Sequence, residues 1–276
     1  MQMIHSKCRG KRMYYELANH LQIADIGFGT WKISEQKEAD LAIKTALECG
    51  YTLIDTASKY KNEDIIGAAL QHAGAERKNI FVEGKVWNKD RGYEKTLAAF
   101  EKTLKTLKMD YLDAYMVHWP AGPLFYDDWE KINADTWRAL EKLYEEKMVR
   151  TIGVCNFETE HLRALEKTSN IKPMLNQVEF HPGCFPEKLY KYCRDSNIQM
   201  QAWSPLGSGI LLKHEKIKTL AEKYKRSPAQ ICLRWCTQQQ VIPLPKSVKP
   251  ERIRENMELE GFLLKKEEIE QLRELI

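Results

Sequence analysis

The chain has 276 residues, of which 43% are hydrophobic and 30% charged, a composition typical of a globular protein. This length suits one large α/β barrel or two small domains. The formal net charge of +4 resides in the first twelve residues, since the rest of the chain holds 39 basic and 39 acidic side chains. The neutral remainder argues against a nucleic-acid-binding face.

We expect residues 1–12 to form a disordered basic leader and residues 13–276 to form a single domain. The leader does not read as a secretory signal, because no apolar segment follows its charges. No segment approaches the ~18 apolar residues that a membrane span requires. The seven cysteines are odd in number and form no CxxC pair, so we expect reduced thiols and a cytoplasmic location.

The sequence predicts a hairpin first and then the strands of a parallel sheet. Residues 14–17 and 21–23 flank a short polar turn and predict a hairpin that plugs one end of a barrel. From residue 26 onward, short apolar runs alternate with segments of helical period, as in a parallel sheet with helical crossovers. The runs lie at 26–29, 52–55, 80–82, 112–117, 151–154, 174–178, 199–203 and 241–244.

Helical period is clearest at 39–49, 93–107, 128–146, 251–259 and 266–275, the last being an extra C-terminal helix. Gly50 ends the first of these, and Ser227-Pro228 reads as the N-cap and first turn of another. A doubly wound sheet is the alternative, but Lys32 stands where the third glycine of GxGxxG belongs. We therefore predict an α/β protein, a (β/α)8 TIM barrel with an N-terminal β-hairpin.

Ionisable residues follow three neighbouring strands of this predicted barrel. Asp55 and Tyr60 come after the second strand, Lys85 after the third and His118 after the fourth. The C-terminal ends of the strands carry the active site of a TIM barrel. A buried ammonium is costly unless an anion pairs with it, and Asp55 can supply that anion to Lys85. Each residue alone has an ordinary structural explanation, but together they indicate a catalytic site.

The chemistry of these four side chains suits carbonyl reduction. The phenol of Tyr60, with a reference pKa of about 10, needs a neighbouring cation such as Lys85 to lower its pKa. His118 can orient or polarise a carbonyl oxygen. The set therefore predicts a proton donor with an oxyanion stabiliser. It offers no GxSxG nucleophile, and the His and Cys residues lack the spacing of metal ligands.

A hydride source is required in addition, and only a cofactor can provide one. TIM barrels often bind phosphates in the loops after strands seven and eight, where residues 204–208 form a small-residue loop. Lys246, Ser247 and Arg252 add cations and a hydroxyl, which favours NADPH over NADH.

Three further side chains suit the nicotinamide end of that cofactor. Trp203 can stack on the ring, although simple core packing is its alternative role. Asn156 and Gln177 can hydrogen-bond the carboxamide.

Eight motifs, taken in order, resemble the aldo-keto reductase superfamily over nearly all of residues 14–276. They are GFGTW at 27–31, DTASKYKNE at 55–63, KVW at 85–87, HWP at 118–120, GVCNF at 153–157, NQVEFHP at 176–182, WSPL at 203–206 and PKSVKPERIREN at 245–256. The resemblance implies that Asp55, Tyr60, Lys85 and His118 form the catalytic tetrad, with Tyr60 as the proton donor.

The resemblance also implies a cofactor site and a substrate pocket. The substrate pocket would be formed by Trp31, Trp87, His118 and Trp119. The NADPH contacts would be Gly29, Thr30, Asp55, Cys155, Asn156, Gln177, Trp203, Ser204, Leu206, Ser208, Lys246, Ser247, Val248, Arg252, Glu255 and Asn256.

The chain departs from the family pattern in three places. Cys155 stands where a serine usually bonds the carboxamide, and a thiol is the weaker donor. Gly84 stands where Ser or Thr is common. The sequence ends at Ile276, soon after the last helix, as in bacterial members with an open pocket such as 2,5-diketo-gluconate reductases and glyoxal reductases. We therefore expect a broad substrate range.

These features predict an NADPH-dependent oxidoreductase that reduces aldehydes and ketones to alcohols by direct hydride transfer. We expect a monomer that acts on small carbonyl compounds, with no metal, nucleic-acid or membrane partner. The first alternative is an NADPH-binding, redox-sensing subunit with little turnover. The second is a barrel isomerase or aldolase, which would need a Schiff base on Lys85.

Overall fold

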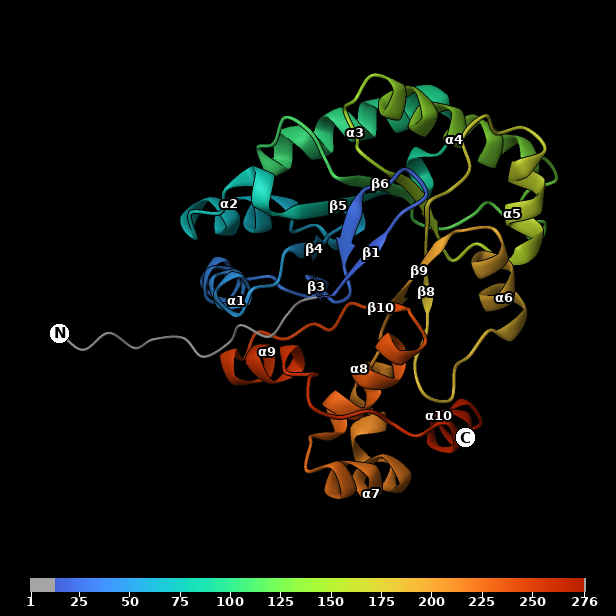
Figure 1. The fold of residues 1–276 in the computed structure, drawn as a ribbon. Coiled ribbons are helices and arrows are strands. Elements are labelled where there is room, and N and C mark those ends of the chain that lie inside the picture. The colour runs from blue at the N-terminus through green and yellow to red at the C-terminus, as the bar shows by residue number, and fades with distance from the viewer. Residues whose placement is uncertain (1–12, 276) are drawn as a thin grey trace.

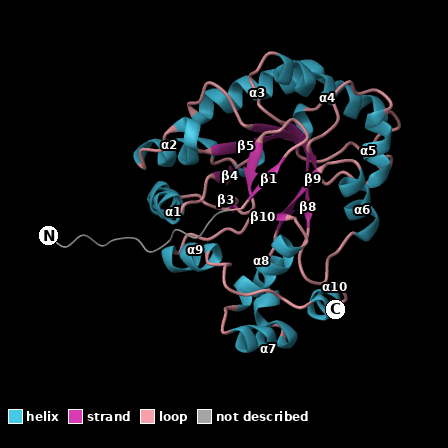
Figure 2. Ribbon diagram, viewed as in Figure 1, coloured by secondary structure: helices cyan, strands magenta, loops and turns pink. Residues whose placement is uncertain are grey.

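Eight parallel strands form the central sheet of the protein, in the order of their sequence from β3 to β10. The computed structural model describes residues 13–275, and its helices surround the strands (Figures 1 and 2). The prediction of a (β/α)8 barrel is confirmed. The strands are β3 (Gly27–Gly29), β4 (Leu53–Asp55), β5 (Phe81–Val86), β6 (Ala114–Val117), β7 (Ile152–Cys155), β8 (Leu175–Glu179), β9 (Gln199–Trp203) and β10 (Ile242–Pro243).

The first strand meets the segment after the last one, which closes the sheet. The backbone N–H of Gly29 donates to the carbonyl oxygen of Pro245 at 3.0 Å. A Cβ at Gly29 would lie 2.9 Å from the carbonyl oxygen of Leu244, and one at Gly27 would lie 2.5 Å from the Leu244 side chain. The two glycines of β3 are therefore needed for this close approach.

The helices begin and end close to where the sequence predicts them. Gly50 has a φ of 91° and ends α1, while the Ser227 hydroxyl accepts a hydrogen bond from the N–H of Gln230 at the start of α8. The helices are α1 (Gln36–Cys49), α2 (Glu63–His72), α3 (Tyr93–Leu107), α4 (Trp129–Glu145), α5 (Thr159–Glu166), α6 (Glu187–Asp195), α7 (Glu215–Tyr224), α8 (Pro228–Gln238), α9 (Pro250–Met257) and α10 (Lys266–Arg273). Short 3-10 helices add η1 (Ser58–Tyr60), η2 (Arg77–Asn79), η3 (Asn88–Asp90), η4 (Gly207–Gly209) and η5 (Leu211–Lys213).

An N-terminal hairpin covers one end of the barrel, as the sequence predicts. Its strands β1 (Tyr14–Glu16) and β2 (Gln22–Ala24) pair antiparallel. Leu17 and Ile23 are buried in one apolar cluster with the residues that begin the barrel strands, namely Leu53, Phe81, Ala114, Leu175 and Ile242. Because all five begin their strands, the hairpin lies at the N-terminal ends of the barrel strands, opposite the predicted site (Figure 1).

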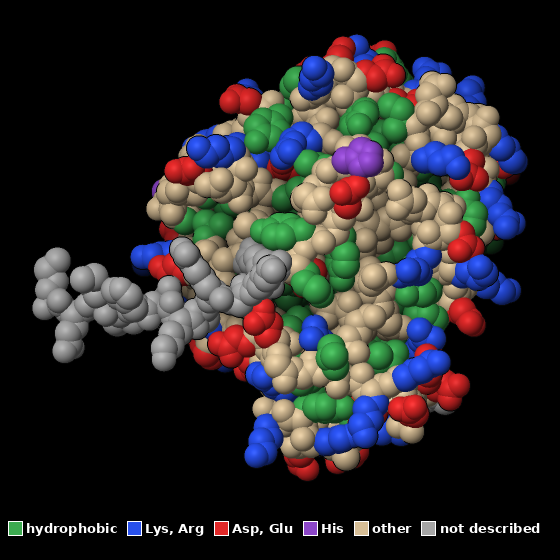
Figure 3. All heavy atoms as spheres, in the orientation of Figure 1, with side chains coloured by type: hydrophobic (Ala, Val, Ile, Leu, Met, Phe, Trp, Pro, Cys, Tyr) green, Lys and Arg blue, Asp and Glu red, His purple; other side chains and the backbone are tan. Residues whose placement is uncertain are grey.

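The outer surface carries charges of both signs. On the face that includes the hairpin, acidic and basic side chains are interspersed among hydrophobic ones (Figure 3). Within residues 13–275, no helix is long and apolar enough to cross a membrane. The predicted basic leader, residues 1–12, lies outside the described residues.

Candidate active site

The four residues of the predicted tetrad meet at the C-terminal ends of β4, β5 and β6. Asp55 is the last residue of β4, and Tyr60 ends the short helix η1 that follows. His118 comes directly after β6. Lys85 lies inside β5, because this strand continues to Val86 instead of ending at residue 82 as the apolar run suggested. The glutamate and lysine in this strand interrupt the apolar pattern and hide its true length.

Lys85 is the centre of the group. Its ammonium forms an ion pair with the Asp55 carboxylate and donates to the Tyr60 hydroxyl oxygen at 3.2 Å and to the carbonyl oxygen of Thr56 at 3.1 Å. Burial alone would lower the pKa of Lys85, but Asp55 and Tyr60 raise it above its usual value. Lys85 is therefore charged, although its side chain is fully buried.

The pKa of Tyr60 is raised, mainly by burial and then by Asp55, while Lys85 lowers it. Lys85 lowers the pKa of Tyr60, as the sequence predicts, but the net shift is upward. The reason is the depth of the site, which penalises the phenolate more than one ammonium can offset. Tyr60 thus remains a protonated phenol in contact with a cation.

His118 is neutral. Burial, together with the cations Lys85 and Lys59, lowers the pKa of its imidazole to about 3. Its ring packs edge-on against Tyr60 and Trp87, with ring centroids 5.8 and 5.1 Å apart. A neutral imidazole carries one N–H and can donate one hydrogen bond to a ligand oxygen. Its Nδ1 is buried and has no hydrogen-bond partner within the described part of the chain.

Two residues predicted to contact the nicotinamide are linked to each other and to His118. The indole N–H of Trp203 donates to Asn156 Oδ1 at 2.8 Å, and Asn156 Nδ2 donates to the carbonyl oxygen of His118 at 2.9 Å. Asn156, Ser204 and Ser208 have φ values of 61°, 50° and 53°. Non-glycine residues are uncommon in this left-handed region, which in this chain also occurs at helix ends such as Lys108 and Lys225.

Most of the other predicted cofactor positions follow the C-terminal ends of β3, β9 and β10. Thr30, next to Gly29, donates from its hydroxyl to the backbone oxygen of Asp55 at 2.8 Å. Lys246 and Arg252 are exposed, and no ion pair involves either of them within residues 13–275. Leu206 and Ser208 lie after β9, Ser247 and Val248 follow β10, and Glu255 and Asn256 lie on α9.

The chemistry of these positions suits a nicotinamide dinucleotide. The amides of Gln177 and Asn156 lie near the tetrad. Lys246, Ser247 and Arg252, after β10 and on α9, add cations and a hydroxyl of the kind that bind phosphates. Among the described residues, no group of three or more His, Cys, Asp or Glu side chains could hold a metal ion.

The departures at Cys155 and Gly84 have different surroundings. The thiol of Cys155 is fully buried, lies 4.0 Å from the sulfur of Met116 and has a pKa raised by burial. At Gly84, a Cβ would point to the side chain of Leu112 at 3.0 Å, away from the tetrad. Gly84 therefore affects packing behind the strand and not the site.

Gln177 connects the tetrad to two residues that the sequence analysis missed. Its Nε2 lies 3.0 Å from Asp55 Oδ1, 3.0 Å from Gln201 Oε1 and 3.2 Å from Glu83 Oε1. Gln201 Nε2 donates in turn to Glu83 Oε2 at 2.8 Å. A signal was present, because Glu83 and Lys85 are two residues apart and residues at that spacing share one face of a strand.

Three tryptophans follow β3, β5 and β6, at the end of the barrel that carries the tetrad. Trp31 and Trp119 are 51% and 42% exposed, and Trp87 is half-buried beneath the ammonium of Lys59 at 4.5 Å. Arg91 holds the loop of Trp119 by donating to the carbonyl oxygens of Trp119 at 3.0 Å and Pro120 at 2.6 Å. Large apolar rings at the same end of the barrel as the polar tetrad suit small organic ligands.

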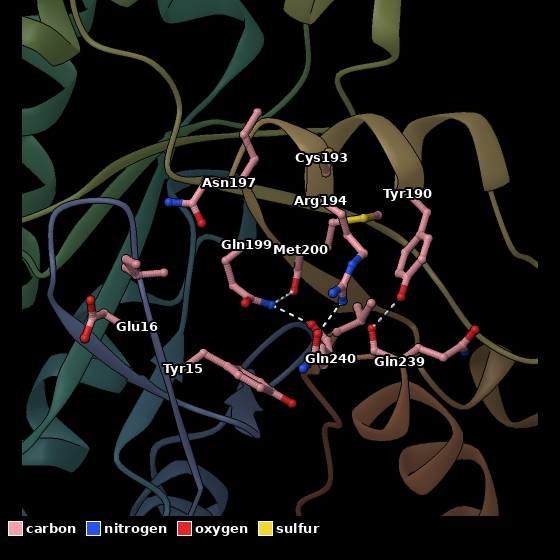
Figure 4. Close-up of a pocket in the computed structure, with 13 residues that line it drawn as sticks. Tyr15, Glu16, Tyr190, Cys193, Arg194, Asn197, Gln199, Met200, Gln239 and Gln240 are labelled. Atoms are coloured by element: carbon pink, nitrogen blue, oxygen red, sulfur yellow. Dashed lines mark hydrogen bonds between the residues drawn. The ribbon is translucent and has the colours of Figure 1, made fainter.

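A separate hollow of about 180 Å³ lies at the hairpin end of the barrel (Figure 4). Its polar side chains bond to the protein itself. Gln199 Nε2 donates to the carbonyl oxygen of Gln240 at 2.8 Å. The Tyr190 hydroxyl donates to the carbonyl oxygen of Gln239 at 3.0 Å. None of the tetrad residues borders it, so we assign it no role in the chemistry.

The barrel and the group of side chains at its mouth define an oxidoreductase that uses a nicotinamide cofactor. The model of the Aldo/keto reductase family matches residues 25–276, and the chain belongs to this family. It is 45% identical to glyoxal reductase of Bacillus subtilis over 257 residues, which cover 93% of this chain and 90% of that protein. It is 41% identical to methylglyoxal reductase DkgA of Yersinia pestis over 246 residues, which cover 88% of this chain and 86% of that protein.

A solved structure also resembles this fold closely. It is a mutant of Gox0644 in complex with NADPH, with a TM-score of 0.87 and 34% identity. The alignment covers 96% of this chain and 93% of that one.

Proposed function

We propose that this protein reduces aldehydes and reactive ketones to alcohols with NADPH, and that Tyr60 is the general acid. The observation that carries the proposal is the contact of a protonated Tyr60 with the charged, buried Lys85. The similarity to a glyoxal reductase and a methylglyoxal reductase supports small carbonyl compounds as the substrates.

In this mechanism the carbonyl oxygen lies between Tyr60 and His118. His118 donates a hydrogen bond that orients the oxygen, and Tyr60 transfers its proton as negative charge develops there. Lys85, held by Asp55, stabilises the phenolate left on Tyr60. NADPH, when bound, supplies the hydride that the carbonyl carbon receives.

We infer that the cofactor lies across the ends of β7 to β10. Asn156, Gln177 and Cys155 would hold the carboxamide, with Trp203 against the ring. The backbone around Gly29 and Thr30 and the side chain of Asp55 would border the nicotinamide. The remaining contacts to the phosphates and adenosine would come from Ser204, Leu206, Ser208, Lys246, Ser247, Val248, Arg252, Glu255 and Asn256.

The substrate would enter past Trp31, Trp87 and Trp119, next to His118. A Schiff-base reaction is disfavoured, because the raised pKa of Lys85 leaves no free amine to attack a carbonyl. The monomeric state, the cytoplasmic location and the single domain over residues 13–276 stay predictions.

The Tyr60→Phe variant tests the proposal. Removing the hydroxyl should lower turnover of small aldehydes by ~10²–10⁴-fold, the usual contribution of a general acid. Binding of NADPH, followed by quenching of tryptophan fluorescence, should change less than about twofold, since the ring is retained.

A matched control is Tyr14→Phe, because Tyr14 is exposed on the hairpin at the other end of the barrel. Near wild-type turnover by Tyr60→Phe would overturn the mechanism. Tight NADPH binding by the wild-type protein without multiple turnover would favour the redox sensor instead.

A further inference from the structure

The barrel interior holds a second carboxyl group that the proposed mechanism does not use. Glu83 lies on β5, two residues before Lys85, and is fully buried. Residues two apart on a strand share a face, so Glu83 faces the barrel axis one layer below Lys85. Its carboxyl oxygens meet the amides of Gln177, from β8, and Gln201, from β9.

The number of hydrogens on Gln177 Nε2 limits which hydrogen bonds this cluster can form. Gln177 Nε2 carries two hydrogens but lies within 3.2 Å of three acceptors, on Asp55, Gln201 and Glu83. The three contacts cannot all be donated by Gln177. A protonated Glu83 removes the excess, because its O–H can supply the hydrogen that Asp55 receives and leaves the two hydrogens of Gln177 for Gln201 and Glu83.

The charges around Glu83 agree with a protonated carboxyl. The groups that act on it are Asp55 of β4 and Lys85 of β5, whose charges cancel each other, and the neutral amides of Gln177 and Gln201. An ionised Glu83 would leave an unpaired anion in the barrel. Burial and the neighbouring Asp55 raise the pKa of Glu83 well above its usual value. Glu83 also acts on Lys85 and on the buried thiol of Cys155.

The consequence concerns the orientation of Gln177. Its Nε2 is engaged inside the barrel, and no hydrogen bond within residues 13–275 involves its Oε1. The atom left for a ligand is therefore an acceptor, and the carboxamide N–H of a nicotinamide is a donor.

We propose that Glu83 is a positioning residue that, as a neutral acid, holds the Gln177 amide with its oxygen toward the nicotinamide carboxamide. This inference rests on the proposed NADPH site. It gives Glu83 no contact with cofactor or substrate; Glu83 acts through Gln177 and Asp55.

The experiment compares the dissociation constants of NADPH and its reduced 3-acetylpyridine analogue, which lacks the carboxamide N–H. Quenching of tryptophan fluorescence gives both constants without turnover. The variants are Glu83→Val, which removes the carboxyl, and Glu83→Gln, which keeps a neutral polar group of the same shape. Met116→Leu, a volume-conserving change of another inward-facing residue, is the control.

We expect Glu83→Val to weaken NADPH at least fivefold and the analogue less than twofold. Glu83→Gln should stay within about twofold of wild type for both ligands. Equal weakening of both ligands by Glu83→Val would mean that Glu83 only supports the fold, and unchanged affinity would mean that it does nothing for the cofactor. Loss of affinity in Glu83→Gln as large as in Glu83→Val would overturn the neutral-acid assignment.

If Glu83→Val does not fold, Gln201→Met provides the same test from β9, because it removes the donor to Glu83 and one acceptor of Gln177. It should also weaken NADPH more than the analogue, and equal weakening would contradict the inference. The two proposals fail separately. A wild-type protein that binds NADPH but reduces no carbonyl contradicts the function and leaves the comparison at Glu83 intact.

Discussion

The buried pair of Asp55 and Lys85 places two opposite charges where water cannot reach them. Such a pair adds little to stability when intact, but removal of one partner leaves an uncompensated charge. The role that we assign to the pair is therefore chemical. A large loss in the free energy of unfolding is expected only when one of the two charges is removed.

Lys85→Met should lower the free energy of unfolding by ~3–5 kcal/mol, because it leaves Asp55 buried without its counter-ion. The double variant Asp55→Asn/Lys85→Met should recover most of this loss. Urea denaturation of the wild type, both single variants and the double variant measures the coupling. A double variant no more stable than Lys85→Met would contradict this account.

The buried side chains of Glu63 and His118 should make the stability of the protein depend on pH in opposite directions. The pKa of Glu63 is raised to about 7 by burial, so its folded state holds a proton that the unfolded state has released, and stability falls as pH rises from 4.5 through 7. The pKa of His118 is lowered to about 3, so the unfolded state binds a proton first and stability falls as pH drops from 6.5 toward 3.

Glu63→Gln should therefore stabilise the protein at pH 7.5, by on the order of 3 kcal/mol at most, and have little effect at pH 4. Urea midpoints at pH 4, 5.5 and 7.5 measure the difference. Glu251→Gln, at an exposed position on α9, is the control. The same change in stability at all three pH values would show that the ionisation of Glu63 is not responsible.

At the scale of the elements, the sequence predicted every barrel strand, because each is a short apolar run set off from a helical segment. The largest error was the length of β5, whose inward positions hold Glu83 and Lys85. A strand with charged inward positions has the sequence pattern of an edge or a loop, and only the closed barrel supplies their partners. Local pattern therefore located the strand but not its end.

A glycine in α2 shows how helix packing overrides local preference. Gly67→Ala would normally stabilise a helix by ~1 kcal/mol. Here a Cβ would lie 2.5 Å from the carbonyl oxygen of Leu107, at the end of α3. We expect a net loss of ~1–3 kcal/mol from overpacking, measured by urea denaturation.

Gly122→Ala is the matched control, because its nearest contact would be His161 Nε2 at 3.8 Å. That variant should change stability by less than about 0.5 kcal/mol. If Gly67→Ala stabilised the protein instead, the separation of α2 and α3 would have to be larger than the structure indicates.

At the scale of the molecule, the two ends of the barrel have different tasks. The hairpin covers an apolar cluster at one end, whereas the opposite end carries the tetrad. The sequence could predict that the tetrad lies at one end of the barrel, because its residues follow successive strands. It could not predict that Glu83 and Gln201 meet Gln177, because residues far apart in sequence come together only when the sheet closes.

This division predicts that stability and activity can be changed separately. Ile23→Ala, in the hairpin, should cost ~2–5 kcal/mol of stability and leave kcat/KM for small aldehydes unchanged. Trp31→Ala should do the reverse, lowering kcat/KM with little effect on stability, since this side chain is 51% exposed. Urea denaturation and steady-state kinetics on both variants measure the two effects, and a clear loss of kcat/KM in Ile23→Ala would contradict the separation.

The burial of the thiols has a chemical consequence for a protein proposed to bind reactive carbonyls. Aldehydes are electrophiles, and the thiolate is the form of cysteine that attacks them. Burial raises the pKa of Cys155, Cys193, Cys232 and Cys236, and that of the half-buried Cys184, so these groups stay as unreactive thiols. The thiol of Cys155, beside the tetrad, can thus share the barrel with a bound aldehyde without adding to its carbonyl carbon.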